Sequence, residues 1–169
     1  MGRQLARLNL ELKARDPDPA ATAAACGRLG AVDRGVLRQR DTYFRVPKGK
    51  LKLRDHLDAG TAELIRYERA EEKGVRASRY QRLDVPPPLG PLLAVALGTI
   101  GVVEKTRRLF LHRHVRIHLD DVAGLGTFVE LEAVEPPPGD PTLDEVIAAL
   151  GLAGRETVAA GYLELLGGS

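Results

Sequence analysis

Pairs of like-charged residues lie two positions apart at several places in this chain of 169 residues. Three such pairs are Lys52 and Arg54, Lys105 and Arg107, and Glu130 and Glu132. Residues two apart on a β-strand point to the same face of the sheet, where like charges repel one another. A fold that places them there needs an opposite charge or a charged ligand between them. The pattern therefore predicts a ligand-binding surface built from strands.

The basic residues at these positions suit a polyphosphate. If the strands close into a barrel, its bore would carry six cations, namely Lys13, Lys52, Arg54, Arg69, Lys105 and Arg107. Such a bore holds more positive charge than its own carboxylates neutralise, and Arg and Lys side chains bind phosphate oxygens well. We therefore expect these six residues to bind the phosphates of a triphosphate-type ligand.

Four acidic residues form a second group, namely Glu11, Asp120, Glu130 and Glu132. Carboxylate oxygens beside phosphate oxygens are usual ligands of Mg²⁺ or Mn²⁺, which keep substrate and water ligands as well. We expect this group to hold such an ion. The ion and the cations would together stabilise charge on the transferred or leaving phosphate.

Each of these features also has a plainer interpretation. A single Lys-x-Arg or Glu-x-Glu on a strand is usually a solvated face. His118 by itself is more often a hydrogen-bonded structural histidine than a ligand or base. Asp120 and Asp121, close before Gly124, fit turn chemistry. The functional interpretation rests on the joint occurrence of these features in one small, β-rich chain.

Alternation of apolar and polar residues, clearest in residues 8–14, predicts that most of the regular structure is strand. Eight strands are expected, at residues 8–14, 36–46, 51–54, 62–69, 78–85, 102–112, 114–121 and 127–134. Helices are expected at residues 20–29, 89–100, 142–150 and 155–166, from helix propensity and apolar periodicity. Strands joined mostly by tight turns favour a mainly β fold, an antiparallel barrel or sandwich with flanking helices, over a parallel α/β sheet.

The composition limits the class of protein further. Hydrophobic residues make up 44% of the chain, enough for one core, so we expect a single domain over residues 1–169. The 25 Lys and Arg nearly cancel the 23 Asp and Glu, and a net charge of +2 argues against binding nucleic acid through bulk basicity. The single cysteine, Cys26, and the lack of a long uncharged apolar segment predict a cytoplasmic protein without a membrane partner.

Seven short segments occur in order, at residues 9–13 (Asn-Leu-Glu-Leu-Lys), 41–44 (Asp-Thr-Tyr-Phe), 51–54, 103–107, 117–120, 124–132 and 162–166. In these segments the chain resembles the CYTH family of triphosphate tunnel metalloenzymes, within its class IV adenylate cyclase-like branch. The resemblance implies a closed, eight-stranded antiparallel β-barrel that is open at both ends. It also implies an enzyme, since members hydrolyse inorganic triphosphate or thiamine triphosphate, or cyclise ATP, with Mg²⁺ or Mn²⁺.

The resemblance also implies roles for individual residues by position. Metal binding is implied for Glu11, Glu130 and Glu132, with Asp120 supporting the site. Phosphate binding is implied for Lys13, Lys52, Arg54, Lys105 and Arg107. Arg69 joins the phosphate binders, with Arg66 as the other choice because the register of residues 62–69 is ambiguous. Lys13, Arg69 and Asp120 are the candidates for a direct part in catalysis.

The first strand departs from the family pattern Glu-x-Glu-x-Lys, because Asn9 stands in place of the first Glu. An amide is neutral, so metal affinity should fall or metal preference should shift. Two functions stay open: an enzyme that hydrolyses or cyclises a triphosphate, or a non-catalytic or repurposed barrel that binds a nucleotide, polyphosphate or other anionic metabolite. Either would be a monomer or homodimer. Tyr43, Tyr67 and Tyr80 could contact an organic group of the ligand or pack in the wall.

Overall fold

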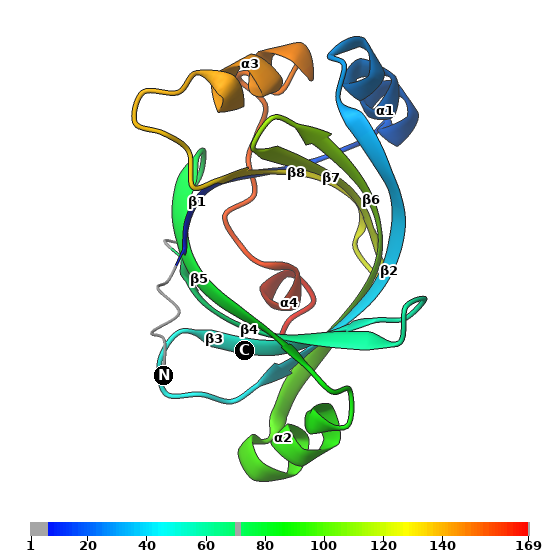
Figure 1. The fold of residues 1–169 in the computed structure, drawn as a ribbon, viewed down its shortest axis with the longest axis vertical. Helices are drawn as coiled ribbons and strands as arrows, with labels where there is room; N and C mark the ends of the chain where they lie inside the picture. Colours follow the sequence, from blue (N-terminus) through cyan, green and yellow to red (C-terminus); the bar gives the residue numbers. More distant parts are fainter. Residues whose placement is uncertain (1–6, 70–71, 169) are drawn as a thin grey trace.

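The computed structural model describes residues 7–69 and 72–168, in which eight strands close into an antiparallel barrel (Figure 1). The strands are β1 (Arg7–Arg15), β2 (Val32–Phe44), β3 (Lys50–His56), β4 (Thr61–Arg69), β5 (Arg76–Val85), β6 (Thr99–His112), β7 (Val115–Val122) and β8 (Gly126–Val134). Their order around the barrel is β1-β5-β4-β3-β2-β6-β7-β8, and β8 pairs with β1 to close it. The predicted closed barrel is confirmed.

The strands alternate between a charged inner face and an apolar outer face. On β8, Glu130 and Glu132 line the interior cavity, whereas Val129 and Leu131 are fully buried in the core outside the barrel. Ile117 of β7 continues this outer core. The two-residue period of the strand therefore separates the face that can bind a ligand from the face that stabilises the fold.

The helices are α1 (Pro19–Arg28), α2 (Leu89–Leu97), α3 (Thr142–Ala149) and α4 (Tyr162–Leu165). α1 and α3 cover the outer face of β7 and β8, where Cys26 and Val146 join the outer core (Figure 1). α2 lies on the opposite side, where Leu93 packs against Phe44 and Leu53. In the part of the chain that the structure describes, no helix is long and apolar enough to cross a membrane.

The β2–β3 hairpin depends on Gly49. Its φ of 70° lies in the left-handed region, and a Cβ there would come within 2.9 Å of the backbone oxygen of Tyr67. A side chain at this position would therefore be strained and would collide with β4. The hairpin sets Asp41 opposite Arg54 across the two strands, so the turn fixes the register of charged residues inside the barrel.

The helix expected over residues 155–166 is wrong in extent. Only Tyr162–Leu165 is α-helical, and Thr157 instead bridges to Ala14 of β1. The chain runs in a non-helical path here because Val158 N–H donates to the backbone carbonyl of Lys13, and the carbonyls of Val158 and Ala160 accept from the side chains of Arg76 and Lys13. The helix expected over residues 89–100 also ends early, at Leu97, because Gly98 has a φ of 78° and β6 begins directly after it.

α4 covers the end of the barrel at which β1 finishes, and Figure 1 shows it within the ring of strands. Tyr162 and Leu163 are buried there with Phe128 and Val122. The ring of Tyr162 lies 5.0 Å from that of Phe128 in a tilted arrangement. Of the two openings that the resemblance implies, the chain itself covers this one, which leaves the end where β1 begins as the approach to the interior.

Candidate functional site

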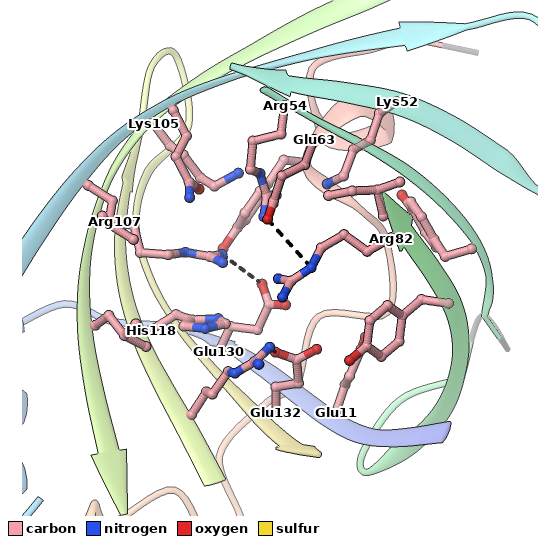
Figure 2. Close-up of a pocket in the computed structure, with 18 of the residues that line it drawn as sticks. Glu11, Lys52, Arg54, Glu63, Arg82, Lys105, Arg107, His118, Glu130 and Glu132 are labelled. Carbon is pink, nitrogen blue, oxygen red and sulfur yellow. Dashed lines mark hydrogen bonds and ion pairs between the residues drawn. The ribbon is translucent and has the colours of Figure 1, made fainter. Parts of the chain in front are cut away.

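The barrel encloses a cavity of about 520 Å³ that is lined by side chains from all eight strands and by Gly161 and Tyr162. Its charges are partly separated by side, although Glu63 lies opposite Arg54 and Arg116 pairs with Glu132. In Figure 2 the cations Lys52, Arg54, Lys105 and Arg107 lie on one side of the cavity, and the carboxylates Glu11, Glu130 and Glu132 lie on the other. These seven predicted site residues are thus brought together around one space, and an anion with a bound cation could lie between the two groups.

Asp41 lies at the centre of the positive side. Its carboxylate is 1% exposed and accepts hydrogen bonds from Lys52 Nζ at 2.7 Å and Lys105 Nζ at 3.0 Å. Arg54 donates to both carboxylate oxygens, at 2.7 and 2.8 Å. Burial opposes the charged form, but Arg54, Lys105 and Lys52 together hold the pKa of Asp41 well below its usual value. A single buried carboxylate therefore holds three of the predicted phosphate-binding residues.

Two lysines on this side have pKa values close to neutral pH. Burial lowers the pKa of Lys105 to about 7, with the charge of Arg54 adding to the effect and Asp41 opposing it. Burial likewise lowers the pKa of Lys52 to about 8, again against the charge of Asp41. The positive charge of the cavity near neutral pH therefore depends on how strongly Asp41 stabilises the protonated form of each lysine.

Arg107 is held by a second buried aspartate. Its Nε and Nη2 each donate to one oxygen of Asp120 at 2.6 Å, and Tyr162 Oη donates to the same carboxylate at 2.9 Å. Arg107 also lies 3.6 Å from Glu130 (Figure 2). Both oxygens of Asp120 are occupied in this arrangement, and Asp120 does not line the cavity as the structure describes it. Its role as a metal ligand stays a prediction, whereas its geometry is that of a residue that orients Arg107.

The carboxylate side brings Glu11 of β1 directly opposite Glu132 of β8, with Glu130 two residues away on the same strand. Burial, followed by the charges of Glu130 and Glu132, raises the pKa of Glu11. The pKa of Glu130 is lowered: burial raises it, but the charges of Lys13 and Arg107 outweigh burial. Negative charge thus gathers in one place, where each glutamate also forms an ion pair with an arginine, and a bound cation could share these carboxylates.

Asn9 lies beside this cluster and is fully buried. Its Nδ2 donates a hydrogen bond to Oε1 of Glu132, while Arg116 donates to the other oxygen at 3.2 Å. A glutamate at position 9 could not donate this bond and would add a further negative charge to the cluster. Oδ1 of Asn9 is buried without a hydrogen-bond partner in the described residues. Asn9 therefore orients one predicted metal ligand.

Lys13 and Arg69 lie near the closed end of the barrel. Lys13 Nζ donates to the carbonyl of Ala160 at 3.2 Å and lies 4.3 Å from the ring centre of Tyr162. Arg69 Nη1 lies 3.6 Å from Oε2 of Glu11. Both cations line the cavity. They are placed where they could contact a phosphate beside Glu11.

The structure resolves the choice of register on β4. Arg69 faces the cavity, whereas Arg66 lies on the outer face and forms an ion pair with Glu68 at 2.6 Å. The same face of β4 places Glu63 in the cavity, where it lies 3.5 Å from Arg82 (Figure 2). The sequence analysis missed Glu63 and Arg82. The spacing could have revealed Glu63, because it lies six residues before Arg69 and side chains an even number of positions apart point to the same face of a strand.

The three tyrosines singled out in the sequence all line the cavity. Lys52 Nζ lies 5.3 Å from the ring centre of Tyr43 and 5.6 Å from that of Tyr67. These distances allow cation–π attraction, so the rings help to place the Lys52 ammonium group. Contact between the tyrosines and an organic group of a ligand stays a prediction.

The sequence of residues 7–142 matches the model of the CYTH domain. The chain belongs to the CYTH domain family. No match was found among curated proteins. The span of the match contains all the cavity residues discussed above except those of the C-terminal segment that follows α3.

Solved structures share the fold of this CYTH domain at low identity. The PH1012 protein of Pyrococcus horikoshii OT3 has a TM-score of 0.80 at 24% identity, covering 93% of this chain and 98% of its own. A candidate adenylate cyclase from Vibrio parahaemolyticus has a TM-score of 0.73 at 18% identity, covering 95% and 98%. HpAC1, a candidate adenylyl cyclase from Hippeastrum described as having a dominant triphosphatase activity, has a TM-score of 0.65 at 15% identity, covering 95% and 97%.

The carboxylate side of this CYTH barrel fits a divalent cation that is shared with a ligand. Glu11, Glu130 and Glu132 offer hard oxygen donors, and burial, followed by the charge of Glu130, raises the pKa of Glu11. Over residues 7–69 and 72–168, no three acidic, histidine or cysteine side chains converge closely enough to enclose an ion by themselves. Mg²⁺ sites commonly use one or two carboxylates and are completed by water and phosphate oxygens, and this donor set is of that kind.

His118 is a neutral histidine in the wall of the CYTH barrel. It is 5% exposed and lies opposite Glu130 on the neighbouring strand. Burial, followed by the charge of Arg107, lowers the pKa of His118 to about 3. Its Nδ1 has no hydrogen-bond partner among the residues that the structure describes. His118 therefore adds no positive charge to the cavity at neutral pH.

Replacing this histidine should flatten the loss of stability on acidification. The pKa of His118 falls from 6.5 in the unfolded chain to about 3 in the folded one, so the unfolded chain binds more protons between these values. The wild type should thus lose about 2 kcal/mol through this group as the pH falls from 6.5 to 5. Urea unfolding at both pH values should show that His118→Gln lacks this loss, whereas the control His112→Gln keeps it. An equal loss in wild type and His118→Gln would contradict the assignment.

Proposed function

We propose that this chain is a divalent-metal-dependent enzyme that acts on a triphosphate bound inside the barrel. One observation carries the proposal: four cations and three carboxylates of the barrel wall face each other across a single cavity. A polyphosphate with a metal ion complements both sides at once. Membership of the CYTH domain family and the likeness to HpAC1, described as a triphosphatase, support the same activity.

In this proposal Glu11, Glu130 and Glu132 hold Mg²⁺ or Mn²⁺, with Asn9 orienting Glu132 through its amide. The ion, when bound, would neutralise charge on phosphate oxygens and on the group that departs. The position of the three carboxylates on neighbouring strands of the cavity wall supports this assignment. Asp120 contributes indirectly, because its two oxygens fix the guanidinium plane of Arg107.

The basic residues bind and orient the phosphate chain. Lys52, Arg54 and Lys105 would hold it from the Asp41 side, and Arg107 would reach it from β6. Lys13 and Arg69, beside Glu11, are placed to stabilise charge on the phosphate that is transferred or released. Hydrolysis places water in line with the phosphorus, and cyclisation places the ribose 3′-hydroxyl there.

A second candidate function is a binding module without efficient turnover. Asn9 favours it, because the metal cluster lacks one carboxylate of the family pattern. Such a module would keep the cations and bind a nucleotide, polyphosphate or other anionic metabolite.

Turnover and binding assays separate the two candidates. Purified protein would be incubated with inorganic triphosphate, thiamine triphosphate or ATP and with Mg²⁺ or Mn²⁺, and phosphate, pyrophosphate and cyclic nucleotide would be measured. Calorimetry on the same samples would report binding. We expect at least one triphosphate to be converted. Tight binding without product under either metal would leave the binding module as the function.

The Glu130→Gln variant should lose metal-dependent activity. The amide keeps the shape of the side chain but removes a negative donor, so kcat/KM at limiting metal should fall by at least about tenfold, and excess Mn²⁺ should restore part of it. The matched control is Glu104→Gln, because Glu104 faces solvent on β6 and pairs with Arg40. Activity of Glu130→Gln equal to that of the control would contradict its assignment as a metal ligand.

The Lys52→Ala variant should weaken substrate binding without changing metal dependence. Loss of one charge-assisted hydrogen bond to phosphate should lower kcat/KM by about ten- to a hundredfold, largely through KM. The control is Arg108→Ala, which removes a cation from the outer face of the barrel, where it pairs with Asp33. Steady-state kinetics at several metal concentrations would show this. A changed metal requirement with an unchanged KM would place Lys52 in another role.

A further inference from the structure

The buried carboxylate of Asp41 touches three cations but cannot touch a ligand in the cavity. Lys52, Arg54 and Lys105 line the cavity, whereas Asp41 is 1% exposed and lies behind them. Its contacts come from β3 on one side and β6 on the other. Any effect of Asp41 on a ligand therefore passes through these three side chains.

Buried cations need a counter-charge before a ligand arrives. Three cations around one cavity repel one another, and burial removes part of the hydration of each. Asp41 supplies a compensating charge and fixes the donors by hydrogen bonds of 2.7–3.0 Å. The cations are thus assembled in the free protein, so a ligand need not pay the cost of ordering them on binding.

Lys105 depends most on this pairing. The charged or titratable groups that face it are Asp41 of β2, Lys52 and Arg54 of β3, Arg107 of its own strand, Asp120 of β7 and Tyr162 of α4. Its side chain is 1% exposed. Burial and the neighbouring cations lower the pKa of Lys105 to about 7, whereas Asp41 raises it. Without Asp41, the lysine would be neutral over more of the neutral pH range.

We propose that Asp41 is a positioning residue that assembles the triphosphate-binding cations in the free protein and extends the pH range over which Lys105 is charged. The proposal rests on the function proposed above, since it assumes that the cavity binds a triphosphate. It makes phosphate affinity depend on pH through a residue that no ligand atom contacts.

The Asp41→Asn variant separates this role from a purely structural one. The amide keeps the size of the side chain but carries no charge, so the pKa of Lys105 falls. At pH 6 more of the lysine is protonated than at pH 8, and the variant has also lost a negative charge, so its affinity for triphosphate should there be nearest to that of the wild type. At pH 8 it should bind more weakly. A general structural defect would weaken binding at both pH values alike.

The experiment is calorimetry of the full chain with inorganic triphosphate at pH 6, 7 and 8, with a chelator present to prevent turnover. The affinity of Asp41→Asn relative to the wild type should fall several-fold between pH 6 and pH 8, up to the limit of about tenfold that one proton and a wild-type pKa of about 7 for Lys105 allow. The control is Asp33→Asn, an exposed aspartate of the same strand that pairs with Arg108, and its relative affinity should stay constant.

A second variant keeps the test decisive if Asp41→Asn does not fold. Lys105→Arg retains Asp41 but carries a charge at every pH tested, because an arginine stays protonated. Titrations in buffers of different ionisation enthalpy measure proton uptake on binding. The wild type at pH 8 should take up more protons than Lys105→Arg, since the ligand's own protons cancel in the comparison. Equal uptake, with equal pH dependence of affinity, would overturn the proposal.

The outcomes also distinguish this proposal from the function on which it rests. A wild type that binds no triphosphate at any pH, either with the chelator or with excess Mg²⁺ or Mn²⁺, would refute the proposed function. If the wild type binds triphosphate and the affinity of Asp41→Asn changes with pH in the same way as that of the wild type from pH 6 to pH 8, only the role of Asp41 is refuted.

Discussion

Balancing buried charge is the constraint on which the rest of this barrel depends. Its interior holds more cations than an ordinary core could tolerate, and each charge taken out of water requires a partner. Two buried aspartates meet much of this requirement: Asp41 holds Lys52, Arg54 and Lys105, and Asp120 holds Arg107. The cations of the positive side remain in excess and face the glutamates of β1 and β8 across the cavity. A phosphate chain would neutralise the cations, and a metal ion would lie between the phosphates and the glutamates.

The fold accommodates this interior because its hydrophobic core lies elsewhere. The outer faces of β1, β7 and β8 pack beneath α1 and α3, and α2 covers the opposite side. Apolar burial on the outside stabilises the closed sheet, which leaves the inner face available for charged residues. The C-terminal segment adds one further element: Tyr162 covers one end of the cavity and binds Asp120, so the covering of the barrel is coupled to the orientation of Arg107.

Much of the fold and part of the site could be predicted from the sequence. The alternation of residue types with a period of two is visible within a single strand. It therefore predicted where the strands lie and that Lys52, Lys105 and Glu130 each share a strand face with a like-charged neighbour. The roles of the buried aspartates were harder to predict. Asp41 binds lysines that lie 11 and 64 residues away in the sequence, and the residues around it do not reveal these partners. The C-terminal segment was misjudged for a similar reason: its apolar spacing suits a helix, but Ala160 accepts a hydrogen bond from Lys13, 147 residues earlier. Long-range pairing of polar groups leaves little trace in local pattern.

The most direct test of the central claim is a crystal structure with a non-hydrolysable triphosphate analogue and Mn²⁺, in which anomalous scattering locates the metal. The account predicts phosphate oxygens on Lys52, Arg54, Lys105 and Arg107, and manganese beside Glu11, Glu130 and Glu132, inside the barrel. A ligand bound on the outer surface, or an interior that stays free of both ligand and metal at saturating concentrations, would contradict it.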